Sequence, residues 1–141
     1  VRPLARIASG GELSRIMLAF KSIQTGNSGR GAMVFDEIDT GISGRMAQVV
    51  AEKMINISRE CQVICVTHLP QIAAASDHEY LVKKQASGDR TVTLVVELDR
   101  EGREREVARM ISGAGGITDS SMRYAGELLA SSREYKKGIR D

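Results

Sequence analysis

Apolar residues recur along the chain at two spacings, and the first of these is the spacing of a helix. After Gly10, apolar side chains stand at positions i, i+3, i+4 and i+7, which puts them on one face of a helix from about Gly11 to Gln24. These side chains are Leu13, Ile16, Met17 and Phe20. The same spacing predicts further helices at about 46–57, 107–111 and 122–129. The tail after Ala130 is rich in Ser, Arg and Lys, and we expect it to be frayed.

The second spacing is that of strands. Ala32–Phe35 and Gln62–Thr67 are short and mainly apolar, which is typical of strands buried on both faces in a parallel sheet. A helix separates them, so the order strand, helix, strand predicts a right-handed parallel crossover. Later, residues 80–84 and the alternating apolar residues of 92–98 flank a turn, which predicts a half-exposed antiparallel hairpin. Residues 25–31 have no repeat and many small side chains, and they predict a loop.

Together these elements predict an α/β fold with parallel strands, flanking helices and an antiparallel hairpin. The 141 residues match the size of one domain that can bury a core without disulfides or metals. The sequence is 42% hydrophobic yet contains only two Phe, three Tyr and no Trp, so the core should be aliphatic. We therefore expect a single globular domain over residues 1–141.

Charge and cysteine content narrow the classes of function only slightly. Twenty Lys and Arg residues against eighteen Asp and Glu give a net charge of +2, without the concentrated basic patch that would itself indicate nucleic-acid binding. Cys61 and Cys65 are not spaced as a CxxC pair, so we expect two reduced, buried thiols rather than a disulfide or zinc site. No apolar stretch approaches the roughly 20 residues that span a bilayer, and no signal segment opens the chain. These features favour a cytoplasmic protein.

The first motif with chemical meaning is Ser9-Gly10-Gly11-Glu12, at the expected start of the first helix. Its two glycines would let a phosphate approach the backbone N–H groups at the positive end of that helix. Ser9 and Glu12 also have the S-x-x-E spacing of a capping box, which closes a helix N-terminus without any ligand. Taken alone the motif favours the capping box, although the two interpretations are compatible.

The second motif is an acidic pair after the strand 32–35. Asp36 and Glu37 would lie at the carboxyl end of a parallel strand, which is where open α/β sheets bind ligands. There Asp36 could hold a hydrated magnesium ion, while Glu37 polarises a water for in-line attack on a terminal phosphoryl group. An isolated Asp-Glu pair is more often a solvated strand end that leads into a turn.

The third feature is His68, which follows the second strand directly and again stands at a carboxyl end. An imidazole in that place could hydrogen-bond a transferred phosphate. A histidine at a strand end is by itself more often a structural residue whose hydrogen bonds are satisfied. His78 has no comparable position, and we assign it no role.

The combination of these features, in this order, resembles the second half of an ATP-binding cassette ATPase. Residues 9–12 look like the signature motif of that family, and Met33–Glu37 like its Walker B strand. Residues 38–43 look like the D-loop, and His68 like the switch histidine. The agreement of several motifs in the right order is far more specific than any one of them.

The amino-acid sequence in and around these motifs is similar to that of the RecN family of bacterial DNA repair proteins. This family belongs with the chromosome-maintenance ATPases. The segments that carry this likeness are 4–15, 35–44 and 66–73. The resemblance runs from Val1 to about Leu129 and is weakest across the hairpin. Ala8 and Glu12 stand where transporter cassettes commonly have Leu and Gln, which argues against a transporter subunit.

One part of the family's machinery is absent from the sequence. No G-x-x-x-x-G-K-[ST] motif occurs, so the backbone cradle and lysine that hold nucleotide phosphates are missing. Gly26–Gly31 is glycine-rich but has no lysine and precedes a strand, so it is no substitute. The chain also begins with Val1 rather than Met. We therefore expect part of a longer protein. The resemblance implies that an N-terminal segment of that protein supplies the phosphate loop and that a coiled coil intervenes.

The resemblance implies a role for each residue in an ATPase head. Two heads would sandwich ATP, with Ser9 and Gly11 contacting the γ-phosphate held by the opposite head. The nucleotide of the same head would be acted on by Glu37, by His68 and, through Mg²⁺, by Asp36. Asp39 would sit at the dimer seam. Hydrolysis would serve DNA double-strand-break repair by switching head engagement, and no membrane is involved. We expect the isolated chain to be catalytically inactive.

Two other classes of function remain open from the residues. The chain could be a non-catalytic docking module in which Ser9 and Glu12 only cap the helix, and Mg-ATP titration would separate this from an ATPase. A metal hydrolase using Asp36, Asp39 and His68 is disfavoured, because few ligands cluster and no nucleophile is evident. The ATPase interpretation requires exposed acids, and it requires Ser9 to lie apart from Glu37 and His68 of the same chain.

Overall fold

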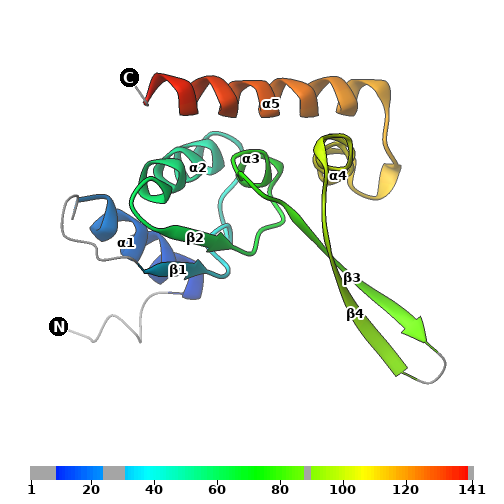
Figure 1. Ribbon diagram of the computed structural model, residues 1–141, viewed down its shortest axis with the longest axis horizontal. Coiled ribbons are helices and arrows are strands. Elements are labelled where there is room, and N and C mark those ends of the chain that lie inside the picture. The colour runs from blue at the N-terminus through cyan, green and yellow to red at the C-terminus, as the bar shows by residue number, and fades with distance from the viewer. Residues whose placement is uncertain (1–8, 24–30, 88–89, 140–141) are drawn as a thin grey trace.

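The computed structural model describes residues 9–23, 31–87 and 90–139 of the chain (Figure 1). Its elements are, in chain order, α1 (Gly10–Ile23), β1 (Ala32–Phe35), α2 (Gly44–Ser58), β2 (Gln62–Cys65), α3 (Pro70–Ala74), β3 (Tyr80–Ser87), β4 (Arg90–Glu97), α4 (Arg100–Ser112), the 3₁₀ turn η2 (Gly113–Gly115) and α5 (Asp119–Gly138). Each expected helix and strand is present, whereas α3 and η2 were not predicted. The loop expected at 25–31 lies almost wholly outside the described residues.

Strands β1 and β2 pair in parallel, which confirms the parallel crossover predicted from the order strand, helix, strand. Ala32 lies opposite Gln62, and Phe35 lies opposite Cys65. Side chains alternate between the two faces of a strand. One face of the sheet, which includes Met33 and Phe35, packs on the core beneath α2 and α3. This packing places the carboxyl ends of both strands at the same edge.

The other face of this small sheet is open. Val34, Ile64 and Val66 alternate with the core-facing residues, and their side chains are 67%, 47% and 61% exposed. The expectation that these strands are buried on both faces is therefore wrong for this chain. The physical reason is that the helices in the described part of the chain supply an apolar surface to one face only.

The core is aliphatic, as the composition predicts, and it has two parts. The larger part joins α1, α2, α3 and the sheet, and its buried residues are Leu18, Phe35, Ile38, Val50, Ala51, Met54, Ile55, Ile57, Ile72 and Ala75. The smaller part joins α3, α4 and α5 through Ala73, Ala74, Val107, Ala108 and Ala125. Small alanines dominate the smaller part, which lets these helices approach closely.

Helix α5 is longer than the sequence indicates. The expectation that the tail after Ala130 is frayed is wrong, because the helix continues to Gly138. The helix runs across α2, α3 and α4 (Figure 1). Thr118 and Ser121 form a capping box at its start. Near its end Ser132 is only 4% exposed, and the Tyr135 hydroxyl accepts a hydrogen bond from Asn56 Nδ2 at 3.2 Å. Tertiary contacts therefore stabilise a polar segment whose composition alone favours disorder.

Strands β3 and β4 form the expected antiparallel hairpin, in a register that places Tyr80 opposite Glu97. The hairpin extends away from the helices (Figure 1), and every residue of β4 is exposed. In the described residues it pairs with no other strand. An isolated two-stranded hairpin is marginally stable in water, so its base must be anchored.

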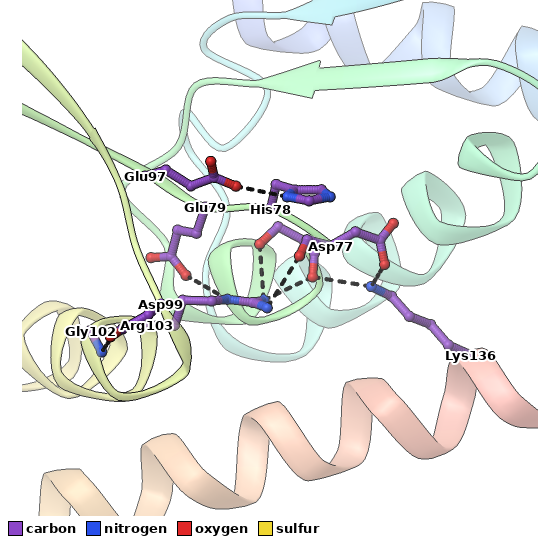
Figure 2. A network of polar contacts seen from close by, with 9 residues as sticks. Asp77, His78, Glu79, Glu97, Asp99, Gly102, Arg103 and Lys136 are labelled. Carbon is purple, nitrogen blue, oxygen red and sulfur yellow. Dashed lines mark hydrogen bonds and ion pairs between the residues drawn. The ribbon is translucent and has the colours of Figure 1, made fainter.

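Arg103 of α4 and Lys136 of α5 provide that anchor by binding the turn before β3 (Figure 2). Arg103 donates from Nη2 to the carbonyl oxygen of Ser76 at 2.8 Å and from Nε to Glu79 Oε2 at 3.4 Å. Lys136 Nζ donates to Asp77 Oδ1 at 2.7 Å. Two helices therefore hold the base of the hairpin in place. Within the described ranges, no helix combines the length and apolarity needed to cross a membrane.

Candidate functional site

The acidic pair lies in solvent at the carboxyl end of β1. The Val66 N–H donates to the Phe35 carbonyl oxygen at 2.9 Å, so both strands end at the same edge of the sheet. Asp36 and Glu37 follow there, and both are exposed. Glu37 has a φ of +58°, a left-handed conformation that is uncommon for a residue other than glycine and that turns the chain back from the strand. Both carboxylates are therefore within reach of a ligand.

The start of α1 packs directly on this turn. A Cβ placed on Gly11 would lie 2.6 Å from the Glu37 carbonyl oxygen and 3.0 Å from Thr40 Cβ. A Cβ on Gly10 would lie 2.7 Å from Glu37 Oε2, the mobile end of a side chain. The second glycine of the motif is therefore required by the close approach of helix and turn, whether or not a phosphate binds there.

Ser9 and Glu12 form the capping box that their spacing predicts. The Ser9 N–H and hydroxyl donate to Glu12 Oε2 at 2.8 and 3.1 Å, and the Glu12 N–H donates to Ser9 Oγ at 3.4 Å. The hydrogen bond from the Ser9 backbone, with that from its side chain, lowers the pKa of the Glu12 carboxyl below its usual value. Glu12 is therefore committed to the cap, and phosphate binding by residues 9–12 stays a prediction.

Two further residues of α1, to which the sequence pattern assigns no role of their own, hold the turn after β1. Ser14 Oγ donates to the Asp36 carbonyl oxygen at 3.1 Å. Arg15 Nη1 donates to the carbonyl oxygens of Ile38 and Thr40 at 2.9 and 2.8 Å. These bonds satisfy backbone acceptors of an irregular loop, where no strand or helix ladder supplies donors within the described residues. Helix α1 and the loop that carries both acids therefore form one unit.

Asp39 links this loop to the end of β2. Its Oδ2 atom accepts hydrogen bonds from Thr67 Oγ1 at 2.6 Å and from the His68 N–H at 2.8 Å, and it lies 3.0 Å from His68 Nδ1. Burial by itself would raise the pKa of the Asp39 carboxyl, but these hydrogen bonds and the nearby imidazole outweigh it and hold the pKa below its usual value. Asp39 is therefore a buried, ionised acceptor.

The structure brings the three sequence motifs to one edge of the sheet, with one feature that the sequence did not indicate. The ATPase interpretation expects the start of α1 to lie apart from Glu37 of the same chain, and this is not so for Gly10, on which a Cβ would lie 2.7 Å from Glu37 Oε2. His68 joins the group through Asp39, and its side chain is 73% exposed. Asp39 is only 3% exposed and binds its own chain, so its contact with a second head stays a prediction.

Neither the cysteines nor the acids suggest a stable metal centre. Cys61 and Cys65 are free, and both are only partly buried where the sequence predicts buried thiols. Within the described residues, no three His, Cys, Asp or Glu side chains are grouped so that they could hold a metal ion. A hydrated Mg²⁺ needs only one or two carboxylates together with substrate phosphates, and the exposed Asp36 fits that requirement.

Comparison with known proteins identifies close relatives of the whole segment. The chain is 48% identical over 129 residues to the DNA repair protein RecN of Halalkalibacterium halodurans. This match covers 92% of the chain and 23% of the relative. It is 45% identical over 137 residues to RecN of Treponema pallidum, covering 97% of the chain and 24% of the relative. With RecN of Bacillus subtilis it shares 44% identity over 136 residues.

These matches confirm the resemblance to RecN that the motifs indicate. They cover 92–97% of the chain, which agrees with the extent from Val1 to about Leu129 that the motifs indicate. The chain spans about a quarter of the length of these curated relatives. No family model matches the chain.

Proposed function

Because the chain is a close sequence relative of one segment of the RecN DNA repair proteins, we propose that it is part of the ATP-hydrolysing head of such a protein. The observation that carries the proposal is the edge of the parallel sheet, where exposed Asp36, Glu37 and His68 follow two adjacent strands. In parallel α/β sheets this edge is where ligands bind. DNA repair is the role that the relatives' name gives, and hydrolysis would switch head engagement rather than modify DNA.

Each side chain at the edge has a chemically distinct task in this proposal. Asp36 would hold Mg²⁺ through water, and the ion would neutralise charge on the phosphates of ATP. Glu37 would accept a proton from the attacking water, for which its exposed carboxylate is suited. His68 would hydrogen-bond the transferred phosphate with its exposed imidazole.

The proposal also requires a second segment, because this sequence contains no G-x-x-x-x-G-K-[ST] motif to hold the nucleotide phosphates. The open face of the sheet, with Val34, Ile64 and Val66, supports such a partner, since parallel sheets are normally covered on both faces. We propose that the N-terminal half of the same head covers this face and supplies the phosphate loop. The chain alone is then inactive and binds ATP and Mg²⁺ weakly.

A second head completes the proposed site. Ser9 and Gly11 would reach the γ-phosphate on that head, and Asp39 would take part in coupling the two sites. The capping box uses the N–H groups of Ser9 and Glu12, and it does not use those of Gly10 and Gly11 at the helix terminus, where a phosphate is electrostatically favoured. Because Gly10 lies beside Glu37 of its own chain, the proposal requires these neighbouring residues to face two different nucleotides.

The substitution Glu37→Gln in the full-length protein tests the proposed hydrolysis. It should lower kcat for ATP by about 10²- to 10⁴-fold, because a general base contributes that much, while ATP-driven head dimers still form. Steady-state ATPase assays and analytical ultracentrifugation measure the two effects. Glu60→Gln, at an exposed acid before β2, is the matched control and should change neither. Unchanged hydrolysis, or loss of the dimers, would remove Glu37 from the role of base.

A non-catalytic docking module is the second candidate, and one observation favours it. Ser9 and Glu12 are fully engaged with each other in the cap and need no ligand. Titration of Mg-ATP into the head reassembled from both halves separates the two candidates. Binding supports the ATPase, and absence of binding supports docking.

A further inference from the structure

The hairpin β3–β4 carries apolar side chains on both of its faces. Residues opposite one another in an antiparallel pair share a face, and neighbours along a strand point to opposite faces. Tyr80, Val82 and Val95 therefore lie on one face, and Leu94 and Val96 on the other. Val82 and Val95 are 61% and 64% exposed, and Leu94 and Val96 are 41% and 47% exposed. Since an antiparallel pair that meets a core on one side usually has a polar opposite face, this pattern is expected of strands covered on both sides.

The apolar side chains concentrate in the half of the hairpin nearest the helices. We call residues 80–83 and 94–97 the base half, and residues 84–87 and 90–93 the tip half, as the register pairs them. The base half has six apolar residues, whereas the tip half has only two, Ala86 and Val92. Because exposed apolar surface of this extent marks an interaction site, the base half requires a partner, and the tip half can stay in water.

The edges of the hairpin are open as well as its faces. Each strand has eight residues and is about 26 Å long. Within the described residues neither strand pairs with a third one, so a row of backbone N–H and C=O groups lies free along each outer edge. Charged residues such as Lys84 and Arg90 protect the tip half against unwanted pairing, because charges on an edge disfavour it. The apolar base half has little such protection.

The hairpin extends towards the side of the molecule that the helices leave open. Helices α2, α3 and α5 lie to one side of the parallel sheet, and the hairpin extends past the sheet in the direction away from them (Figure 1). Its direction is fixed, because Arg103 and Lys136 bind the turn before β3. The open face of β1–β2, with Val34, Ile64 and Val66, also lacks a cover from these helices. One body on this side can therefore contact both surfaces.

We propose that the base half of the hairpin joins the fold of the N-terminal half of the same head, with one edge paired to a strand of that segment and both faces covered. This inference rests on the proposed function, in which that segment supplies the phosphate loop. A single helix could cover only one face and would leave both edges unpaired, so a partner with a sheet of its own fits better. The chain spans about a quarter of the length of its curated relatives, which leaves ample sequence in such proteins for this body.

Amide hydrogen exchange followed by mass spectrometry, without nucleotide, compares the chain alone with the full-length protein. In the chain alone the whole hairpin should exchange rapidly, because two strands without a third are marginally stable. In the full-length protein the base half should exchange at least about 100-fold more slowly, while the tip half stays fast. Equal exchange of the base half in the two proteins would overturn the proposal. Slowing that increases with protein concentration would assign the cover to a second copy, and it would overturn the proposal too.

Lysine substitutions test the two faces separately. Val82→Lys and Leu94→Lys place a charge on opposite faces of the base half, and Thr91→Lys in the tip half is the matched control. All three sites are exposed in the chain, so its urea midpoint should hardly change. In the full-length protein each of the first two should return the base half to rapid exchange, since an unpaired charge resists burial. Thr91→Lys should keep the protection. Protection that survives Val82→Lys or Leu94→Lys would show that one face is open and contradict the proposal.

Failure of this inference and failure of the proposed function are distinguishable, because exchange without nucleotide reports on the fold alone. If the full-length protein hydrolyses ATP while the base half stays unprotected, the inference is wrong and the proposed function stands. If the base half is protected on both faces while the protein neither binds nor hydrolyses Mg-ATP, the proposed function fails and the pairing of the hairpin stands.

Discussion

At the scale of single residues, the edge above β1 and β2 places negative charge near a partly buried thiol. Burial first, and the carboxylates of Asp39 and Asp36 after it, together raise the pKa of Cys65 to about 12. The same two carboxylates disfavour a further anion at this edge unless a cation is present. A Mg²⁺ ion at Asp36, or a lysine from another segment, would meet that need in the proposed site.

The thiol of Cys65 should accordingly resist alkylation in the folded chain. At pH 8.5 only roughly one molecule in three thousand would carry the thiolate that reacts, against about half for an ordinary cysteine. In a Cys61→Ser variant, where Cys65 is the remaining thiol, iodoacetamide should label it at least about a hundredfold more slowly in the native state than in urea. Mass spectrometry over a time course measures the ratio. Equal rates would contradict both the burial and the field of the two acids.

At the scale of elements, α1 and the loop after β1 act as one body. Gly11 allows the contact, Arg15 bridges two carbonyl oxygens of the loop, and Ser14 binds a third. A displacement of the start of α1 would therefore also displace the loop that carries Asp36 and Glu37. In the proposed head this unit would connect the surface that meets the second head with the residues that act on ATP.

The two adjacent glycines at the start of α1 should respond differently to alanine. Gly11→Ala should destabilise the chain by about 1–3 kcal/mol, because its Cβ would clash with the Glu37 carbonyl oxygen and with Thr40. Gly10→Ala should cost little, since it meets only the mobile end of the Glu37 side chain, and alanine favours a helix by up to about 1 kcal/mol. Urea unfolding followed by circular dichroism compares them. Equal stabilities for the two variants would mean that helix and loop separate freely in solution.

At the scale of the whole molecule, the described part of the chain forms two separate sheets and leaves many apolar side chains exposed. The parallel pair β1–β2 is open on one face, and the hairpin β3–β4 extends from the helices with apolar residues in solvent (Figure 1). The anchors of the hairpin and the long packing of α5 stabilise the rest. This combination is expected of a segment that completes its fold with a partner, because large exposed apolar patches mark interaction surfaces.

The open face can be tested with one substitution in two proteins. Val34→Thr should change the stability of the chain alone by less than about 0.5 kcal/mol, since the side chain is 67% exposed there. In the full-length protein it should cost about 1–3 kcal/mol, because the hydroxyl would be buried against the other half of the head. Val63→Thr, on the core face, should destabilise both proteins. Equal small effects of Val34→Thr in the two proteins would show that nothing covers this face.

Much of this architecture could be predicted from local sequence, and the exceptions share a physical cause. Helical spacing located α1 to within one residue at each end, and the apolar run gave β1 its observed limits, Ala32–Phe35. The last turns of α5 were missed because Tyr135 and Ser132 are held by contacts with distant residues, which composition does not record. The open sheet face was missed because an apolar run shows that burial is favourable, without showing which segment provides it.

For the candidate site, the sequence by itself determined which chemical groups are present and in what order: a glycine-led helix start, two acids after one strand and a histidine after the next. Those features depend on residue type and on spacing along the chain, which are local properties. Only the tertiary structure decided that Asp39 turns inward to His68, that Gly10 lies beside Glu37, and that Ser14 and Arg15 hold the loop. Such contacts join residues more than twenty positions apart, and their geometry is set by how the helices pack on the sheet.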